Sequence, residues 1–328
     1  MPGSIDIVIV NYNGEQWLTR CLLSLAADVA RCESNVSITI VDNASTDGSI
    51  QLIRSLLLDV AILELDHNIG FGNASNLGVA EGTSSYILLL NNDVVVPPGM
   101  LNQLVMELEL NQYDAIAARE APYEGGETGN YRSTLDCFGY PVFIRANERS
   151  KRSIYLSAAC VLIRRDVFES LGGFDPDFFM YFEDTDLFWR LLLQGGTFDY
   201  AAQAFVLHAG HGSSGGIGWS ELRFVWRNEN QLRALVKNSS TTYLLMVVPL
   251  FIVLQFLEFL ILFLFKPRIA LTYPRGMWAF LSSIRSTLDK RKHVQAKRTV
   301  STWAIYKLMY HGNGKLVALA RSMGILRG

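Results

Sequence analysis

Three groups of polar residues follow short apolar runs in the first hundred residues, and their side chains are of types that bind metals and nucleotides. Asn11 and Tyr12 follow residues 5–10 (IDIVIV), Asp42 follows residues 37–41 (SITIV), and residues 91–93 (NND) follow residues 86–90 (YILLL). A carboxylate such as Asp93 at the end of a buried strand can hold Mg²⁺ or Mn²⁺ against a diphosphate, because hard cations prefer oxygen ligands. Taken alone, residues 91–93 fit a turn or a helix cap before Pro97 equally well.

A second acidic group, residues 183–186 (EDTD), follows the aromatic run of residues 178–182 (FFMYF). Acids at the start of a helix usually cap it and interact with the helix dipole. The aromatic neighbours can also form a partly desolvated pocket, in which a carboxylate acts as a general base toward a hydroxyl group. We expect one of Asp184 and Asp186 to cap the helix and the other to face a cleft.

His208 ends another strand-like run, and His211 follows three residues later in a loop rich in glycine and serine, residues 210–218. A single histidine is more often structural than a ligand. A glycine-rich loop, however, permits close approach to phosphates, and imidazole suits Mn²⁺. Residues 68–73 (NIGFGN) lack the GxGxxG spacing after a strand, and the chain contains no GxxxxGK[ST]. A dehydrogenase and a P-loop NTPase are therefore disfavoured.

These groups need a scaffold, and the sequence indicates an α/β one. Strand patterns at residues 5–10, 37–41, 61–65 and 86–90 alternate with helical patterns near residues 17–25, 50–57 and 73–80. This alternation predicts βαβ units and a mostly parallel sheet flanked by helices, with ligands beyond the carboxyl ends of its strands. Residues 120–152 show weak periodicity and predict a long loop over the site.

The carboxyl-terminal part differs in character. Residues 243–265 form an apolar stretch long enough to span roughly 30 Å of hydrocarbon. From Lys266 onward 13 basic residues stand against one acidic residue, whereas the rest of the chain has 16 basic and 30 acidic residues. Glu258 interrupts the apolar stretch, and a charge at mid-depth costs at least ~2.5–3.5 kcal/mol. A single span would also carry the basic tail across the membrane, against the positive-inside tendency.

We therefore expect a re-entrant, hairpin or in-plane helix that associates with the membrane surface and keeps the tail cytoplasmic. The alternative is a buried helix that pairs with another subunit. The predicted domains are residues 1–240, which carry the chemistry, and 241–328, an apolar and then basic helical region. The four cysteines have no metal-ligand spacing, and the amino terminus runs directly into a strand pattern, so a cytoplasmic catalytic part is expected.

Together these motifs resemble the family-2 glycosyltransferases of GT-A fold, most closely the bacterial rhamnosyltransferase-like enzymes of surface polysaccharide synthesis. The resemblance covers roughly residues 4–240. It rests on residues 8–13 (VIVNYN), 41–49 (VDNASTDGS), 68–76 (NIGFGNASN), 90–93 (LNND), 172–175 (GGFD), 182–187 (FEDTDL) and His208. Each motif alone is weak, but the ordered set is specific.

The resemblance implies an inverting transfer of one sugar, with dTDP-rhamnose as the expected donor, to a lipid-linked saccharide at the cytoplasmic face of the plasma (inner) membrane. It implies Asp184 as catalytic base, and Asp93 and His208 as ligands of Mg²⁺ or Mn²⁺. The implied nucleotide-sugar-binding residues are Asn11, Tyr12, Asp42, Asn73, Asn76 and Asn92. The DxD-type motif reads NND here, so the metal has one carboxylate fewer than in the usual motif.

Other functions stay open at this point. Another hexosyl or galactofuranosyl transferase of the same family fits the motifs, and so does a non-catalytic nucleotide-sugar-binding protein, although no matched position is missing. A nucleotidyltransferase would usually carry a basic, glycine-rich phosphate loop, and residues 11–14 (NYNG) contain no Lys or Arg. A processive synthase would need several spans and a QxxRW-type motif, whereas residues 223–226 read RFVW. No nucleic-acid partner is expected, and the sequence leaves an oligomer open.

Overall fold

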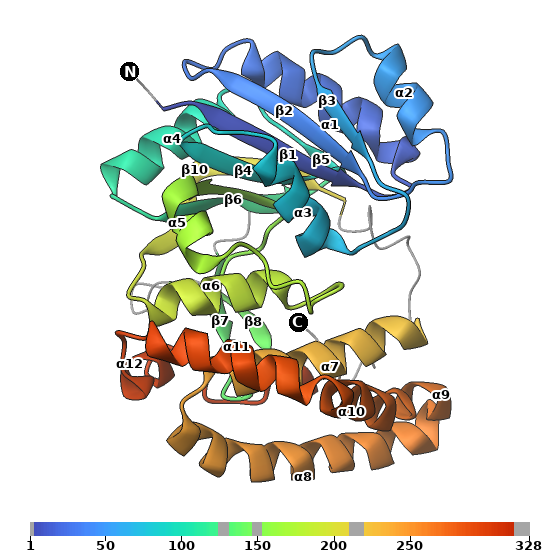
Figure 1. Ribbon diagram of the computed structural model, residues 1–328, viewed down its shortest axis with the longest axis vertical. Helices are drawn as coiled ribbons and strands as arrows, with labels where there is room; N and C mark the ends of the chain where they lie inside the picture. Colours follow the sequence, from blue (N-terminus) through green and yellow to red (C-terminus); the bar gives the residue numbers. More distant parts are fainter. Residues whose placement is uncertain (1–2, 124–130, 146–152, 210–219, 318–328) are drawn as a thin grey trace. The chain divides into compact units, whose positions relative to one another are not determined.

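Figure 1 shows the computed structural model of the chain, which describes residues 3–123, 131–145, 153–209 and 220–317. Contacts between residues divide it into two units. The first unit comprises Met1–Asn130, Leu156–Phe179 and Thr197–Ile217, and the second comprises Tyr131–Tyr155, Met180–Gly196 and Gly218–Gly328.

An eight-stranded sheet forms the first unit, in the order β3-β2-β1-β4-β9-β6-β10-β5. Its strands are β1 (Ile5–Asn11), β2 (Val36–Asp42), β3 (Ala61–Glu64), β4 (Tyr86–Asn91), β5 (Val94–Val95), β6 (Ala115–Pro122), β9 (Cys160–Arg164) and β10 (Phe198–His208). Strands β1 to β4 pair in parallel, as do β6 and β10, whereas β9 runs antiparallel to both of its neighbours. The predicted strands and their mostly parallel arrangement are confirmed.

Because β9 is antiparallel to β4 and to β6, those two strands point the same way. The carboxyl ends of β1, β2, β4, β6 and β10 therefore meet at one edge of the sheet. Every residue of β1 is buried, which explains why this strand reads as a nearly continuous apolar run. The helices of the first unit are α1 (Glu15–Val29), α2 (Ser49–Ser55), α3 (Phe71–Ala80), α4 (Met100–Leu110) and α5 (Arg165–Leu171).

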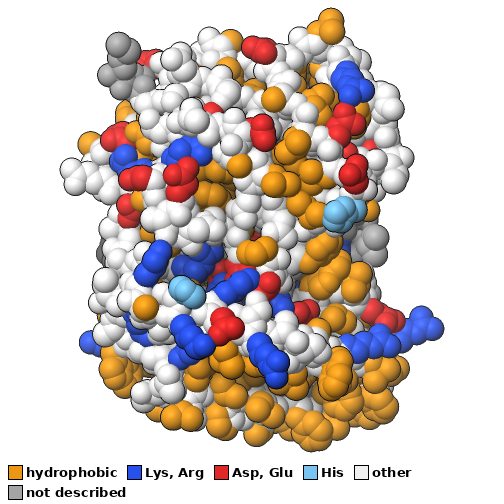
Figure 2. All heavy atoms as spheres, viewed as in Figure 1, with side chains coloured by type: hydrophobic (Ala, Val, Ile, Leu, Met, Phe, Trp, Pro, Cys, Tyr) orange, Lys and Arg blue, Asp and Glu red, His pale blue; other side chains and the backbone are white. Residues whose placement is uncertain are grey.

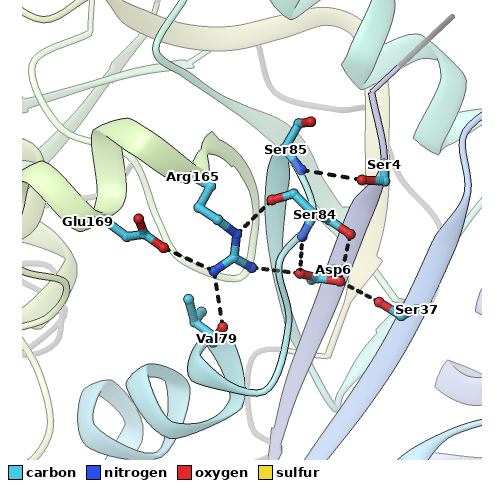
Figure 3. A network of polar contacts seen from close by, with 8 residues as sticks. All are labelled: Ser4, Asp6, Ser37, Val79, Ser84, Ser85, Arg165 and Glu169. Carbon is cyan, nitrogen blue, oxygen red and sulfur yellow. Dashed lines mark hydrogen bonds and ion pairs between the residues drawn. The ribbon is translucent and has the colours of Figure 1, made fainter.

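The opposite edge of the sheet is held by a buried ion pair. Asp6, near the start of β1, lies 2.6 Å from Arg165 Nη2 at the start of α5. Ser84 donates to the same carboxylate from its backbone N–H and its hydroxyl, and Ser37 donates from β2 (Figure 3). Arg165 also donates to two backbone carbonyls, those of Ser84 and Val79. This network ties β1, β2, α3 and α5 together on the side away from the carboxyl ends.

The prediction of a loop over residues 120–152 is wrong for the described residues. β6 continues to Pro122, and β7 (Tyr131–Leu135) and β8 (Pro141–Arg145) form an antiparallel hairpin in the second unit. Asp136 stabilises its turn, because its Oδ1 accepts backbone hydrogen bonds from Phe138 and Tyr140. Residues 124–130 and 146–152 lie outside the described part.

Helices dominate the second unit. They are α6 (Glu183–Leu193), α7 (Glu221–Asn238), α8 (Thr241–Phe265), α9 (Pro267–Ala270), α10 (Thr272–Ser282), α11 (Ile284–Ala296) and α12 (Thr302–Tyr306). Among the described residues α8 is the one helix long and apolar enough to cross a membrane, with a mean hydropathy of 2.6. Its buried residues are Tyr243, Phe251, Glu258 and Leu262, whose spacing follows a single stripe along the helix.

Most of the remaining surface of α8 is exposed and apolar. Leu245, Phe256 and Leu264 are 74%, 57% and 78% exposed. Figure 2 shows hydrophobic side chains covering the surface that α8 occupies in Figure 1. Glu258, the charge that interrupts the apolar stretch, faces the protein. It accepts a hydrogen bond from Tyr273 Oη (2.9 Å) and pairs with Lys315 Nζ (3.0 Å).

Candidate active site

Asp93 and His208 lie together at the carboxyl edge of the sheet. The two-residue strand β5 follows Asp93 directly and pairs antiparallel with the end of β10, so that Val94 stands opposite His208. The backbone N–H of Ala209 donates to the Asp93 carbonyl (3.1 Å), which extends this pairing. As a result His208 Nε2 lies 3.1 Å from the buried Asp93 carboxylate. The structure thus brings together the two residues that the sequence proposes as metal ligands.

A third residue, Glu120, completes this cluster. It lies near the end of β6, the parallel neighbour of β10, and its Oε2 is 2.6 Å from His208 Nδ1. Burial lowers the pKa of His208, but hydrogen bonds to Asp93 and Glu120 and the charges of both carboxylates outweigh it and raise the pKa to about 10. The imidazole is therefore protonated near neutral pH and bridges two acids.

The cluster has the donor chemistry of a Mn²⁺ or Mg²⁺ site. A carboxylate and an imidazole nitrogen are acceptable ligands of Mn²⁺. A bound metal would displace the proton of Nε2, and Glu120 on Nδ1 would leave Nε2 as the ligating atom. Next to Asp93, the Oδ1 of Asn92 is buried and makes no hydrogen bond within the described part of the chain. In the same part, no three His, Cys, Asp or Glu side chains are arranged to hold an ion alone. The residues therefore fit a metal that takes further oxygen ligands from a bound substrate.

A second polar cluster joins the ends of β1, β2 and β4. Asn11 donates from Nδ2 to Asp42 Oδ1 (2.8 Å) and accepts from Asn92 Nδ2 (2.8 Å). All three side chains are buried. Gly14 makes this close approach possible, because a Cβ there would lie 2.2 Å from Asn92 Nδ2 and 2.3 Å from Asn11 Oδ1. Three of the predicted donor-binding residues are therefore in direct contact.

The turns that follow β1 and β2 are also locked to each other. Ser45 Oγ accepts from the Asn13 backbone N–H (2.9 Å), and Asn13 Oδ1 accepts from the Thr46 backbone N–H (2.7 Å). Asn13 and Ala44 both adopt positive φ, which is uncommon for residues other than glycine. Tyr12 is half-buried between these turns. Such strained turns persist only where surrounding contacts hold them, and they often mark functional sites.

Asn73 and Asn76 bind the protein backbone. Asn76 exchanges two hydrogen bonds with Phe174, donating to its carbonyl (2.8 Å) and accepting from its N–H (2.9 Å). Asn73 donates to the carbonyls of Ile69 (3.0 Å) and Pro176 (3.2 Å). Both side chains thus attach α3 to the segment after α5, and their assignment to a nucleotide pocket stays a prediction.

Asp184 lies in the second unit, in the first turn of α6. The two residues before Glu183, Tyr181 and Phe182, have φ of 68° and 70°, a costly conformation for bulky side chains. Asn230 of α7 holds this turn by donating from Nδ2 to the carbonyls of Met180 and Tyr181, both at 2.9 Å. A strained turn that is anchored in this way presents the acidic residues in a fixed orientation.

The two aspartates of α6 differ sharply in environment. Asp184 is half-buried and its Oδ1 accepts from the Thr185 backbone N–H (2.6 Å). Asp186 is fully buried and pairs with Arg190 Nε and Lys237 Nζ, both at 2.8 Å. Neither caps the helix, because the cap residue is Phe182. Our expectation of one capping aspartate is wrong, since Asp186 serves as a buried counter-ion instead.

Glu183 is buried between these groups. Its Oε2 makes no hydrogen bond within the described residues. Burial, and next the charge of Asp184, raise the pKa of Glu183 to about 8. Its environment therefore favours the protonated form.

The comparisons with known proteins decide the family. The model of glycosyl transferase family 2 matches residues 6–172, slightly more than half of the chain. The chain belongs to glycosyl transferase family 2. The matched region carries Asn11, Asp42, Asn92, Asp93 and Glu120.

Relatives of this family-2 enzyme include rhamnosyltransferases. It is 28% identical over 238 residues to the N-acetylglucosaminyl-diphospho-decaprenol L-rhamnosyltransferase of Mycobacterium tuberculosis, which covers 63% of this chain and 76% of that protein. The resemblance to rhamnosyltransferases is thereby confirmed.

Solved structures establish the fold. The crystal structure of GalNAc-T7 with UDP, GalNAc and Mn²⁺ superposes with a TM-score of 0.61 at 18% identity, over 74% of this chain and 49% of that one. The mannosyltransferase PcManGT from Pyrobaculum calidifontis, in complex with GDP-Man and Mn²⁺, gives a TM-score of 0.54 at 14% identity, over 100% and 82%. The predicted GT-A fold, with its apolar helix near the carboxyl end, is confirmed, and the protein is a glycosyltransferase.

Sequence reasoning missed Glu120 as part of the site. The available signal was its place just after residues 115–118 (AIAA), since an acid after an apolar run has the same character as Asp93 after β4. His211 and the glycine-rich loop of residues 210–218 lie outside the described residues.

Proposed function

We propose that this family-2 glycosyltransferase transfers L-rhamnose from dTDP-rhamnose to a lipid-linked saccharide, with inversion at the anomeric carbon and with Mn²⁺ or Mg²⁺. The observation that carries the proposal is the cluster of Asp93, His208 and Glu120 beside the contacting Asn11, Asp42 and Asn92. The first three supply metal chemistry and the others supply polar groups at the same sheet edge, which is where open α/β sheets bind ligands. The relative named for L-rhamnosyl transfer supports the choice of sugar.

In this proposal Asp93 and His208 Nε2 hold the metal, and Glu120 fixes the imidazole through Nδ1. When bound there, a divalent metal would supply positive charge against the charge that develops on the departing nucleoside diphosphate. Asn11, Asp42 and Asn92 would contact the nucleotide, as would Tyr12, which is half-buried in the turn after β1. Asn73 and Asn76 contribute to donor binding indirectly, through the backbone segments that they hold in place.

Asp184 is the proposed base, on the strength of the family resemblance at residues 182–187. It takes the proton of an acceptor hydroxyl while the hydroxyl oxygen attacks the anomeric carbon, and one displacement then inverts the configuration. Burial raises the pKa of Glu183, which favours its protonated form, and Asp184 is the more exposed carboxylate of the two. A single base suffices because no covalent sugar intermediate is formed, unlike in retaining glycosidases.

We further propose that α8 lies in the plane of the cytoplasmic face of the membrane. Its buried stripe runs along the whole helix and includes Glu258, which is paired with Lys315. A helix that packs along its length against protein and exposes the rest of its apolar surface suits an interface better than a span. The basic residues of α9 to α11 suit anionic lipid headgroups. A lipid-linked acceptor would explain this location.

The test is transfer by the purified full-length protein from dTDP-rhamnose to a polyprenyl-diphosphate-linked N-acetylglucosamine, with and without Mn²⁺. Metal-dependent formation of an α-L-rhamnoside supports the proposal. Transfer from UDP-galactofuranose or another donor instead would assign a different hexosyl or galactofuranosyl transferase. Donor binding without any transfer would identify a non-catalytic nucleotide-sugar-binding protein.

A further inference from the structure

A cavity of about 320 Å³ opens in the second unit between α7, α8 and α10. Its volume lies at the lower end of the roughly 300–1,000 Å³ that is typical of small-molecule sites. The walls are mainly apolar, with Leu232 from α7, Phe256 and Phe259 from α8, and Met277 from α10. The two phenylalanine rings are stacked, with centroids 6.3 Å apart. Such a lining suits a hydrocarbon chain and offers little to a polar ligand.

The cavity is continuous with the exposed apolar surface of α8. Ile252 and Phe256 line it and are also 50% and 57% exposed, so its mouth lies on that surface. A hydrocarbon chain that enters the cavity from a lipid layer in contact with α8 would therefore stay in apolar surroundings throughout.

Two polar side chains contribute to the lining. Asn228 and Gln255 line it, and both accept hydrogen bonds from Lys315 Nζ, at 3.0 and 3.3 Å. Lys315 also pairs with Glu258 and lies over the Tyr273 ring, 4.5 Å from its centroid. These polar groups bind one another, so they do not need a polar ligand in the cavity.

Next to two lining residues, α10 exposes side chains typical of a membrane interface. Arg275 follows the lining residue Pro274; its side chain is 58% exposed and pairs with Glu221 Oε2 (3.1 Å). Trp278 follows the lining residue Met277 and is 74% exposed. An exposed cation and an exposed indole beside lining residues of α10 are of the types that occur where a protein surface contacts a membrane.

We propose that this cavity binds a segment of the isoprenoid chain of the lipid-linked acceptor. The inference rests on the proposed function, which supplies a lipid acceptor, and it assigns the isoprenoid chain of that acceptor a specific site in the second unit. The cavity would thereby restrain the acceptor in the plane of the membrane and raise its local concentration.

The test uses the full-length protein in detergent and geranylgeranyl phosphate as the isoprenoid probe. Met277→Trp fills the cavity, whereas Leu281→Trp adds the same bulk to α10 at a residue that is 51% exposed and outside the lining. Geranylgeranyl phosphate should raise the Tm of the wild type and of Leu281→Trp but not of Met277→Trp. The KM for a polyprenyl-linked acceptor should rise roughly tenfold in Met277→Trp, the factor that 1.4 kcal/mol represents, with kcat unchanged.

A photoreactive geranylgeranyl phosphate, crosslinked to the wild type and mapped by mass spectrometry, keeps the test independent of how Met277→Trp folds. Crosslinks to α7, α8 and α10 support the proposal. Crosslinks elsewhere, or full competition by a phospholipid without an isoprenoid chain, overturn it and would assign the cavity to bulk lipid. Donor binding to the same samples, measured by calorimetry, reports separately on the proposed function, because the donor residues lie in the first unit.

Discussion

Asp184 and Asp186 lie two residues apart on α6, and we predict opposite consequences for the same substitution. Asp186→Asn removes the charge from a carboxyl group that is 0% exposed and leaves Lys237 and Arg190 without this counter-ion. Breaking a buried ion pair in this way costs about 3–5 kcal/mol. At roughly 2–4 °C per kcal/mol, the Tm should fall by roughly 6–20 °C.

Asp184→Asn, by contrast, changes a half-buried side chain and should alter the free energy of unfolding by less than about 1 kcal/mol. It removes the proposed base, so kcat should fall by at least roughly 10²–10⁴-fold, the contribution typical of general base catalysis. Affinity for the donor should stay close to that of the wild type, because the donor residues lie in the first unit.

The assay compares both variants with the wild type in thermal unfolding, in donor binding by calorimetry and in release of nucleoside diphosphate coupled to transfer. Asp184→Asn is the matched control for stability, and Asp186→Asn is the matched control for chemistry. More than a tenth of the wild-type kcat in Asp184→Asn, in protein with normal donor affinity, would refute the base assignment. An unchanged Tm in Asp186→Asn would refute the account of its buried ion pairs.

Four further predictions concern residues outside this helix. Glu120→Gln should weaken Mn²⁺ binding roughly 10–100-fold by calorimetry, as loss of a group that orients a ligating histidine does, and an unchanged affinity would exclude that role. In metal-free protein the stabilisation from protonated His208 should be complete below pH about 6.5 and disappear as the pH rises toward 10. Denaturant unfolding across this pH range measures the difference in free energy of unfolding between the wild type and His208→Gln. A difference that does not change with pH would contradict the prediction. Arg165→Met should destabilise the protein by about 3–5 kcal/mol in urea unfolding, because it leaves the Asp6 carboxylate buried without its cation, and donor affinity should not change. Asn230→Ala should lower kcat while leaving donor affinity intact, because the strained turn before α6 loses its anchor; steady-state kinetics would show this, and a rise in KM for the donor alone would speak against it.

Part of the first unit could be predicted from the sequence because its central strands β1 and β4 are buried on both faces. Such strands give short apolar runs, and residues 5–10 and 86–90 stand out for this reason. β5 has only two residues, too few for any periodic pattern, yet it places Asp93 against His208. The β7–β8 hairpin was missed because its strands are short and mix polar with aromatic residues, a composition that resembles a loop.

The candidate site also has residues that the sequence alone could predict and others that depend on the fold. Asn11 and Asp42 end apolar strands, and Asp93 lies two residues after another, so their types and positions alone indicated a site. The contribution of Glu120 depends on β6 lying beside β10, a pairing between strands far apart in the sequence. The different roles of Asp184 and Asp186 depend on Lys237, which approaches from α7. Contacts of this kind follow from the fold and leave no local pattern.

The most direct test of the central claim is calorimetric titration of the full-length protein with dTDP-rhamnose, with and without Mn²⁺, beside the variant Asp93→Ala. Our account predicts binding that Mn²⁺ strengthens in the wild type and that Mn²⁺ no longer affects in Asp93→Ala. Equal Mn²⁺-dependent binding by both proteins, or no binding of any nucleotide sugar by folded wild-type protein, would contradict it.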